Sequence, residues 1–225
     1  MPFPRLTLNQ YTFERSDMSS GIFESQVDFP KAGEPAWRIA LFYPEQGGWT
    51  ETDYLNLDGG PLVEFESGFV EVLDRPTKDH QRIVQFLFIL LRAFVSAQCH
   101  GEVFVAPLPV RLSPGKFREP DIVFVGADRG EYKGVPDGAD LVVEVVSAAA
   151  DGRRRDTQIK VTEYAAAGIA EYWIIDPENE TITVNHLVNH SYDSVFSFHR
   201  GDLAKSQRLP GFEVAVDDVL NSAAG

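Results

Sequence analysis

The alternation of apolar and polar residues predicts a β-hairpin followed by one long helix. Residues 62–73 alternate apolar and polar positions around Ser67-Gly68, the pattern of two paired strands joined by a tight turn. Residues 79–98 repeat apolar side chains at the i, i+3, i+4, i+7 spacing of an amphipathic helix. Val84, Phe88, Ile89 and Val95 add further apolar positions, so we expect a central helix that is covered nearly all round.

The second half of the chain predicts buried strands around another helix. Residues 120–125 and 141–147 are apolar runs, and the run at 141–147 shows no alternation, which is typical of a strand buried on both faces. A helix is predicted over residues 156–168 and a further buried strand over residues 171–176. This order predicts an α/β fold in which a mixed β-sheet is flanked by helices, with β-hairpin additions.

Three shorter elements complete the prediction. Residues 49–55 predict a short helix that begins with a capping box. Residues 102–112 read as a single strand, placed at a sheet edge because Pro107 and Pro109 cannot donate backbone hydrogen bonds. Residues 181–188 are expected to pair back as a hairpin.

Two regions are expected along the chain. Residues 1–48 predict an N-terminal extension of hairpins and loops packed on the core, with one strand at residues 36–43. A role as a lid or as a dimer arm is the alternative for this extension. Residues 49–225 form the predicted main domain.

Composition and charge narrow the class of protein. The 225 residues carry a net charge of −14, and such a surface lacks the broad basic face of most nucleic-acid-binding proteins. The single cysteine, Cys99, excludes an internal disulfide framework. The sequence shows neither an apolar run of membrane-spanning length nor a signal peptide, so no membrane partner is expected and the location is predicted to be cytoplasmic.

Glu144 is the residue whose surroundings call for an explanation. It lies in the middle of a run of valines, where a buried carboxylate is costly unless it is paired or binds a metal ion. Asp121 begins a neighbouring apolar strand, and Lys160 follows on the next predicted helix. The alternatives for Glu144 are a core salt bridge to Lys160 and a metal-ligand role.

Carboxylates that converge with one lysine suit the hydrolysis of phosphodiesters. Carboxylate oxygens hold Mg²⁺ or Mn²⁺, which polarises a phosphate and activates water. A lysine can offset the negative charge that develops on the phosphate. The spacing of Asp121, Glu144 and Lys160 permits this chemistry.

Several motifs in fixed order make the sequence similar to a known family. They are Leu62-Val-Glu64 before a Ser-Gly turn, Asp79-His80-Gln-Arg-Ile-Val, Pro120-Asp121-Ile-Val-Phe-Val, Glu144-Val-Val-Ser, Arg-Arg-Asp-x-x-x-Lys at residues 154–160, Tyr164-Ala-Ala-Ala-Gly168 and Glu171-Tyr-Trp-Ile-Ile-Asp176. Over residues 49–190 the chain resembles the Uma2 family, formerly DUF820. The resemblance implies a restriction-endonuclease-like PD-(D/E)XK nuclease fold and a metal-dependent endonuclease activity.

The resemblance also implies roles for single residues. It makes Asp121 and Glu144 metal ligands and Glu64 a further acidic residue that completes the metal site. The lysine of this superfamily usually stands two residues after the second acid, where this chain has Val146. The resemblance places the catalytic lysine at Lys160 instead.

Neighbouring residues have plainer interpretations. We expect His80 to be a capping or surface group and Asp156 to cap its helix or pair with a nearby arginine. Tyr164, Tyr172 and Trp173 are expected in the core. Arg153–Arg155 is either a phosphate-contacting patch or a solvated run of charge.

Two functions follow from these observations. The first is a Mg²⁺- or Mn²⁺-dependent endonuclease that acts on nucleic acid, expected to be DNA, as a homodimer. The alternative is a nuclease-fold protein that has lost catalysis and serves as a binding or assembly module, which the net charge of −14 favours.

Overall fold

The structure is a computed structural model that describes residues 44–57, 62–98, 101–132 and 134–224. Residues 1–43, which include the predicted strand at 36–43, lie outside the described residues. The division of the chain at residue 48 therefore stays a prediction. None of the helices formed by the described residues is long and apolar enough to cross a membrane.

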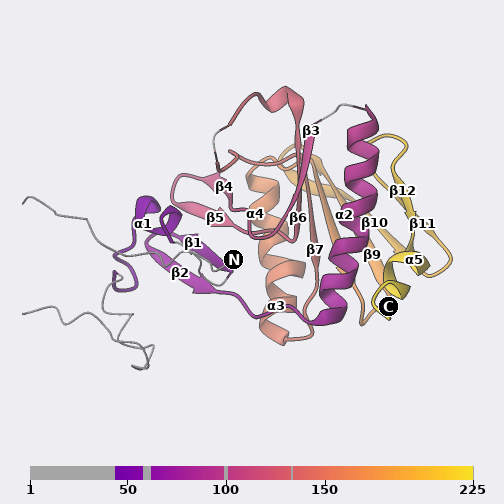
Figure 1. Cartoon of the computed structure of the whole chain (residues 1–225), viewed down its shortest axis with the longest axis horizontal. Coiled ribbons are helices and arrows are strands. Elements are labelled where there is room, and N and C mark those ends of the chain that lie inside the picture. Colours follow the sequence, from indigo (N-terminus) through magenta and orange to yellow (C-terminus); the bar gives the residue numbers. More distant parts are fainter. Residues whose placement is uncertain (1–43, 58–61, 99–100, 133, 225) are drawn as a thin grey trace, which may run out of the picture. The chain divides into compact units, whose positions relative to one another are not determined.

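A mixed six-stranded sheet forms the centre of the fold (Figure 1). Its strand order is β10-β9-β8-β7-β6-β3, in which β7 and β8 run parallel and all other neighbours are antiparallel. Every residue of β7 is buried, as its lack of alternation predicts. The strands are β3 (Gly101–Val105), β6 (Ile122–Gly126), β7 (Leu141–Val145), β8 (Glu171–Asp176), β9 (Thr181–Val188) and β10 (Ser191–His199).

A four-stranded sheet of order β2-β1-β5-β4 lies beside the central sheet. The predicted hairpin is confirmed as β1 (Val63–Glu66) and β2 (Phe69–Val72), which turn through Ser67 and Gly68 at positive φ. A Cβ at Gly68 would lie 2.8 Å from the Gly47 carbonyl oxygen, so glycine is required there. The remaining strands are β4 (Val110–Ser113) and β5 (Lys116–Arg118), with β11 (Leu203–Lys205) and β12 (Glu213–Ala215) as a separate pair.

The single strand predicted over residues 102–112 is wrong. β3 belongs to the central sheet and β4 to the four-stranded sheet, so the chain changes sheets between them. Pro107 and Pro109 stand at this change, because a residue without a backbone N–H cannot continue a ladder of hydrogen bonds.

The helices differ from the predicted ones at two places. The helical segment expected to begin at Asp156 begins at Ala150, since α3 runs through a π-helical turn, η3 (Arg155–Ile159), directly into α4. On α2, Ile89 is 63% exposed, so the helix is covered on one face and not all round. The helices are α1 (Glu51–Leu55), α2 (Lys78–Gln98), α3 (Ala150–Arg154), α4 (Lys160–Ala166) and α5 (Val216–Asn221), with the 3-10 turn η2 (Ala127–Arg129).

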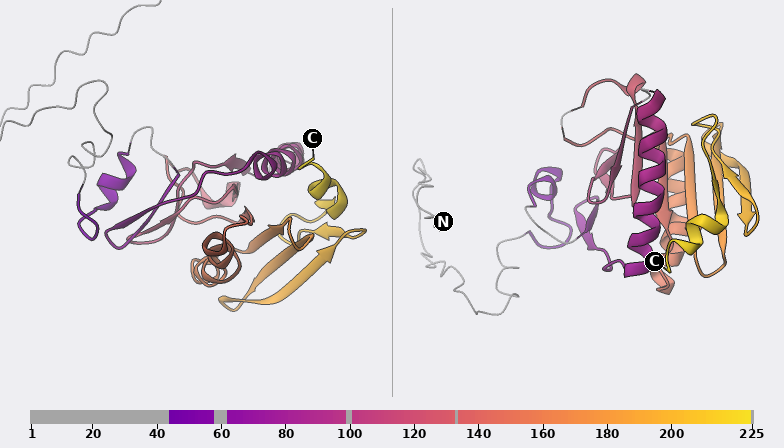
Figure 2. Two further views of the ribbon diagram at one scale, coloured as in Figure 1. Left: turned by 90° about the horizontal axis from the view of Figure 1, so that it is seen from below. Right: turned by 45° about the vertical axis from the view of Figure 1, so that its right-hand side comes forward.

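The central sheet is packed on both faces (Figure 2). On one face, Leu141, Val143 and Val145 of β7 pack with α2, α5 and the β11–β12 pair. On the other face, Val142 and Val146 pack with Tyr164 of α4. Because side chains alternate along a strand, Glu144 projects toward the α4 face. The fold therefore sets the central carboxylate of β7 against a helix.

Candidate functional site

The pairing of β6 with β7 brings Asp121 and Glu144 together. Ile122 lies opposite Val143 in this antiparallel pair, and one further step along the register sets Asp121 opposite Glu144. Residues directly opposite in an antiparallel pair project to the same face. The Asp121 carboxylate also accepts a hydrogen bond of 2.8 Å from the Val145 backbone N–H, which fixes it beside β7.

Lys160 lies at the centre of a buried cluster of carboxylates. Its Nζ lies 2.7 Å from Glu144 Oε1, 3.1 Å from Glu64 Oε1 and 3.5 Å from Asp156 Oδ1. The Tyr164 hydroxyl donates a 2.7 Å hydrogen bond to the same oxygen of Glu144. Asp156, Lys160 and Tyr164 thus lie on the side of the helical segment that is turned toward β7.

The charge balance of this cluster shifts its pKa values. Burial alone would lower the pKa of Lys160, but the carboxylates of Glu144, Glu64 and Asp156 raise it well above its usual value. Burial raises the pKa of Glu144, and Asp121 and Asp156 add to this effect against the opposing charge of Lys160. The ammonium therefore stays charged, while the carboxylates around it repel one another.

Glu64 reaches Lys160 from the four-stranded sheet. Besides its contact with Lys160, its Oε2 lies 3.5 Å from Arg118 Nε, and its Oε1 accepts a 3.4 Å hydrogen bond from the Glu119 backbone N–H. Glu64 is buried and does not line the cavity in which Asp121 and Glu144 meet. The structure thus brings it to the same lysine that contacts Glu144, but not to the wall of that cavity.

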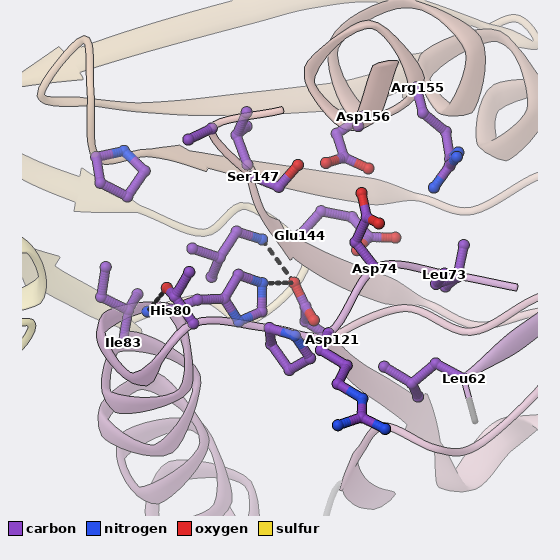
Figure 3. A pocket seen from close by; sticks show the side chains of 18 of the residues that line it. Leu62, Leu73, Asp74, His80, Ile83, Asp121, Glu144, Ser147, Arg155 and Asp156 are labelled. Atoms are coloured by element: carbon purple, nitrogen blue, oxygen red, sulfur yellow. Dashed lines mark hydrogen bonds and ion pairs between the residues drawn. The ribbon is translucent and has the colours of Figure 1, made fainter. Parts of the chain in front are cut away.

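A cavity of about 220 Å³ opens onto Asp121, Glu144 and Lys160 (Figure 3). One part of its wall is the segment that leads from β2 into α2, and another is the turn from β7 into α3. Figure 3 shows Asp121, Glu144 and His80 on one side and Asp156 with Arg155 on another. The carboxylates are therefore accessible from solvent through a recessed opening.

His80 is a member of this site, which differs from its predicted role as a capping or surface group. Its Nε2 lies 3.1 Å from Asp121 Oδ2, and its side chain is only 13% exposed. Burial would lower the pKa of His80, but the hydrogen bond and charge of Asp121 raise it. Local sequence carries no signal for this contact, because it depends on where the first turn of α2 meets the start of β6.

Two other predicted roles change in the structure. Asp156 contacts Lys160 instead of capping a helix or pairing with an arginine. Arg153 pairs with Asp176, at 2.5 and 3.0 Å, and Arg155 forms an ion pair with Glu71. Tyr164, Tyr172 and Trp173 are buried in the core as predicted.

The donor set of the cavity fits a hard divalent cation held by few protein ligands. Within the described ranges, no three His, Cys, Asp or Glu residues are arranged to enclose a metal ion by themselves. Mg²⁺ characteristically keeps several waters and binds through one or two carboxylates plus substrate phosphates. Two lining atoms, His80 Nδ1 and Ser147 Oγ, are buried without a hydrogen-bond partner among the described residues, so the cavity has unused polar groups.

The fold and the site together define a class of protein. Two carboxylates from adjacent strands of a mixed sheet lie beside a lysine from the following helical segment. The family model described as "Uma2: Putative restriction endonuclease" matches residues 49–217, and the chain belongs to this family. The resemblance seen in the sequence motifs is thereby confirmed.

A solved structure shows the same fold. It is described as that of "a putative nuclease belonging to DUF820 from Anabaena variabilis", and it superposes with a TM-score of 0.66 at 18% sequence identity. The match covers 78% of this chain and 99% of the other. The predicted fold class, a mixed sheet flanked by helices, is confirmed. No curated protein matches the chain.

Proposed function

We propose that this chain is an endonuclease that hydrolyses phosphodiester bonds of nucleic acid, with DNA as the expected substrate. The observation that carries the proposal is the meeting of Asp121, Glu144 and Lys160 in one cavity. Membership of the family described as "Putative restriction endonuclease", and a fold shared with a structure described as a "putative nuclease", support it.

Each residue has a defined role in this proposal. Asp121 and Glu144 hold a divalent cation, Mg²⁺ or Mn²⁺, which supplies Lewis-acid chemistry to the phosphate when bound. Burial raises the pKa of Glu144 and the charge of Asp121 adds to this effect, so such a cation would relieve the repulsion between the two carboxylates. Lys160 presents a permanent positive charge that offsets the charge developing on the phosphate.

Glu64 is assigned a positioning role in place of the metal-ligand role expected from the sequence. Both of its oxygens are engaged by Lys160 and Arg118, and it lies behind the lysine rather than on the cavity wall. With Asp156 it holds the Lys160 ammonium in place. Tyr164 orients Glu144 in the same way through its hydroxyl group.

Incubation of the protein with an oligonucleotide tests this function. We expect cleavage with Mg²⁺ or Mn²⁺, no cleavage with a chelator, and a loss of roughly 100-fold or more in rate for Asp121→Ala, in line with other electrostatic catalytic groups. Wild-type cleavage no faster than that of Asp121→Ala would contradict the proposal.

A binding or assembly module without catalysis is the second candidate. It is favoured by the net charge of −14 and by Lys160, whose ammonium contacts the carboxylates of Glu64 and Glu144. Calorimetry with Mn²⁺ separates the two candidates. A nuclease binds Mn²⁺ in a way that Glu144→Gln abolishes, whereas an inert module shows no binding that depends on Glu144.

The proposed form of the enzyme is a homodimer, because the cleavage of two strands calls for two sites. The outermost strand β10 supports this, since Val195 and Phe196 are exposed by 52% and 44%. Sedimentation should give twice the chain mass of 25.1 kDa. A monomer at all concentrations would contradict it.

A further inference from the structure

Most of the positive side chains in the described part of this acidic protein are used in internal ion pairs. Across the sequence, 34 Asp and Glu residues face 20 Lys and Arg residues, so carboxylates are in excess. In the described part of the chain, the cations that contact no carboxylate are Arg75, Lys78, Arg92 and Arg154. An exposed cation without a carboxylate partner is therefore uncommon here and its location is informative.

Three of these four cations stand around the opening of the candidate site. Arg75 lines the cavity, and Lys78 is flanked on both sides by lining residues of the segment 73–80. Arg154 lines a neighbouring hollow of about 360 Å³ that shares Arg155 with the cavity. All three side chains are exposed. The unpaired positive charge is thus concentrated at one place on the described surface.

The ion pairs also distinguish between the members of the arginine triplet at residues 153–155. Arg153 pairs with Asp176, and Arg155 pairs with Glu71. These two guanidinium groups therefore already have carboxylate partners. Only Arg154 remains available for an external anion.

Phosphate groups are the partners that suit these cations in a nuclease. We propose that Arg75, Lys78 and Arg154 contact backbone phosphates on either side of the phosphodiester that enters the cavity; this inference rests on the proposed function. Two exposed carboxylates at the same rim, Asp74 and Asp151, have no cation partner among the described residues. Because these two carboxylates offset part of the positive charge, the cations attract phosphate only at short range. The protein should therefore bind a strand through few phosphates.

Salt dependence of binding measures this directly. Fluorescence anisotropy would follow a labelled oligonucleotide, single-stranded or duplex, with Ca²⁺ in place of Mg²⁺ so that binding is observed apart from cleavage. Each neutralised phosphate contact changes the slope of log affinity against log salt by about 0.9 for duplex DNA and about 0.7 for a single strand. We expect Arg75→Gln, Lys78→Gln and Arg154→Gln each to reduce the slope by about that amount.

Arg92→Gln is the matched control. Arg92 lies further along α2, where it packs over the Phe88 ring, and its loss removes the same charge. It should leave the slope unchanged, and all four variants should bind Mn²⁺ as the wild type does. Slopes that change equally in Arg92→Gln and the rim variants, or in none of them, would overturn the inference while nucleic-acid binding itself persists. A wild type that binds no oligonucleotide would instead overturn the proposed function and the inference with it.

Discussion

At the residue scale, the buried ammonium of Lys160 compensates the negative charge of the carboxylates around it and so stabilises the folded protein. Only 3% of Lys160 is exposed, and Glu144, Glu64 and Asp156 all contact its Nζ. Removing one partner from a buried ionic cluster leaves uncompensated charge, which costs about 3–5 kcal/mol. Lys160 therefore has a structural effect that is separate from its proposed catalytic one.

Lys160→Met should destabilise the protein in a pH-dependent manner. The folded-state pKa of Glu144 is already raised above 4.5 by burial, and losing the lysine raises it further. A raised pKa gives stability that is present below 4.5 and lost as the pH rises through the folded value. Urea unfolding should show a larger deficit at pH 8 than at pH 5.

The exposed pair of Lys205 with Glu213 supplies the control for that experiment. Lys205→Met removes the same kind of side chain where 63% of it is exposed, so it should change stability little at either pH. Equal effects of the two substitutions would contradict the account of the buried cluster.

His80→Ala should weaken Mn²⁺ binding by about 10- to 100-fold, as the loss of a group that orients a metal ligand does elsewhere. The reason is the 3.1 Å contact of His80 Nε2 with Asp121 Oδ2. Calorimetry measures this affinity, with the exposed His199→Ala as the control. Unchanged affinity in His80→Ala would show that Asp121 needs no such support.

The sequence predicts part of this site for a physical reason. A carboxylate among valines must have a partner, so Glu144 is conspicuous, and helical spacing sets Lys160 and Tyr164 on one face. His80 lacks such a signal, because a histidine in the first turn of a helix looks the same whether it faces solvent or a strand end. Only the packing of α2 against β6 and β7 decides between the two.

At the scale of elements, boundaries were less predictable than the elements themselves. The helical segment begins at Ala150 after Ala149, which provides no capping side chain, so the sequence has no start signal there. The strand predicted over residues 102–112 divides between two sheets, which its apolar pattern alone does not reveal. β7, by contrast, is buried on both faces and its composition predicts this directly.

Glu171 links β8 by hydrogen bonds to the segment after β11. Its fully buried carboxylate accepts hydrogen bonds from the backbone N–H groups of Gln207 and Arg208, at 2.8 and 3.0 Å, and from Trp173 Nε1 at 2.5 Å. His186 Nδ1 lies 3.0 Å from the same carboxylate. All of these groups require an acceptor at this position.

Glu171→Gln should therefore lower the free energy of unfolding by about 1–3 kcal/mol, because the new amide turns a donor toward donors. Urea unfolding measures the change. Glu180→Gln, at a 56% exposed side chain paired with Arg200, should stay within about 0.5 kcal/mol of the wild type. An unchanged free energy of unfolding in Glu171→Gln would contradict this role of the carboxylate.

At the scale of the whole molecule, several carboxylates whose pKa is lowered by their partners should make the protein sensitive to acid. Asp140 is one of them. Burial would raise its pKa, but the Gly126 N–H, Arg129 and Arg208 lower it below 3.8. A lowered pKa gives stability that is present above 3.8 and lost as the pH falls through the folded value.

Asp140→Asn should flatten the fall in stability below pH 4, although it lowers stability at neutral pH. Thermal unfolding between pH 2 and pH 7 measures both effects. Asp193→Asn, at an exposed residue, should leave the shape of the curve unchanged. Parallel curves for Asp140→Asn and the wild type would contradict the assignment.

The central claim is that Asp121, Glu144 and Lys160 form a metal-dependent site for phosphodiester hydrolysis. The rate of oligonucleotide cleavage as a function of Mn²⁺ concentration, in the wild type and in Glu144→Gln, tests it most directly. The account predicts a rate that saturates with Mn²⁺ in the wild type and falls by roughly 100-fold or more in Glu144→Gln. Cleavage that is independent of Mn²⁺, or equal in the two proteins, would contradict it.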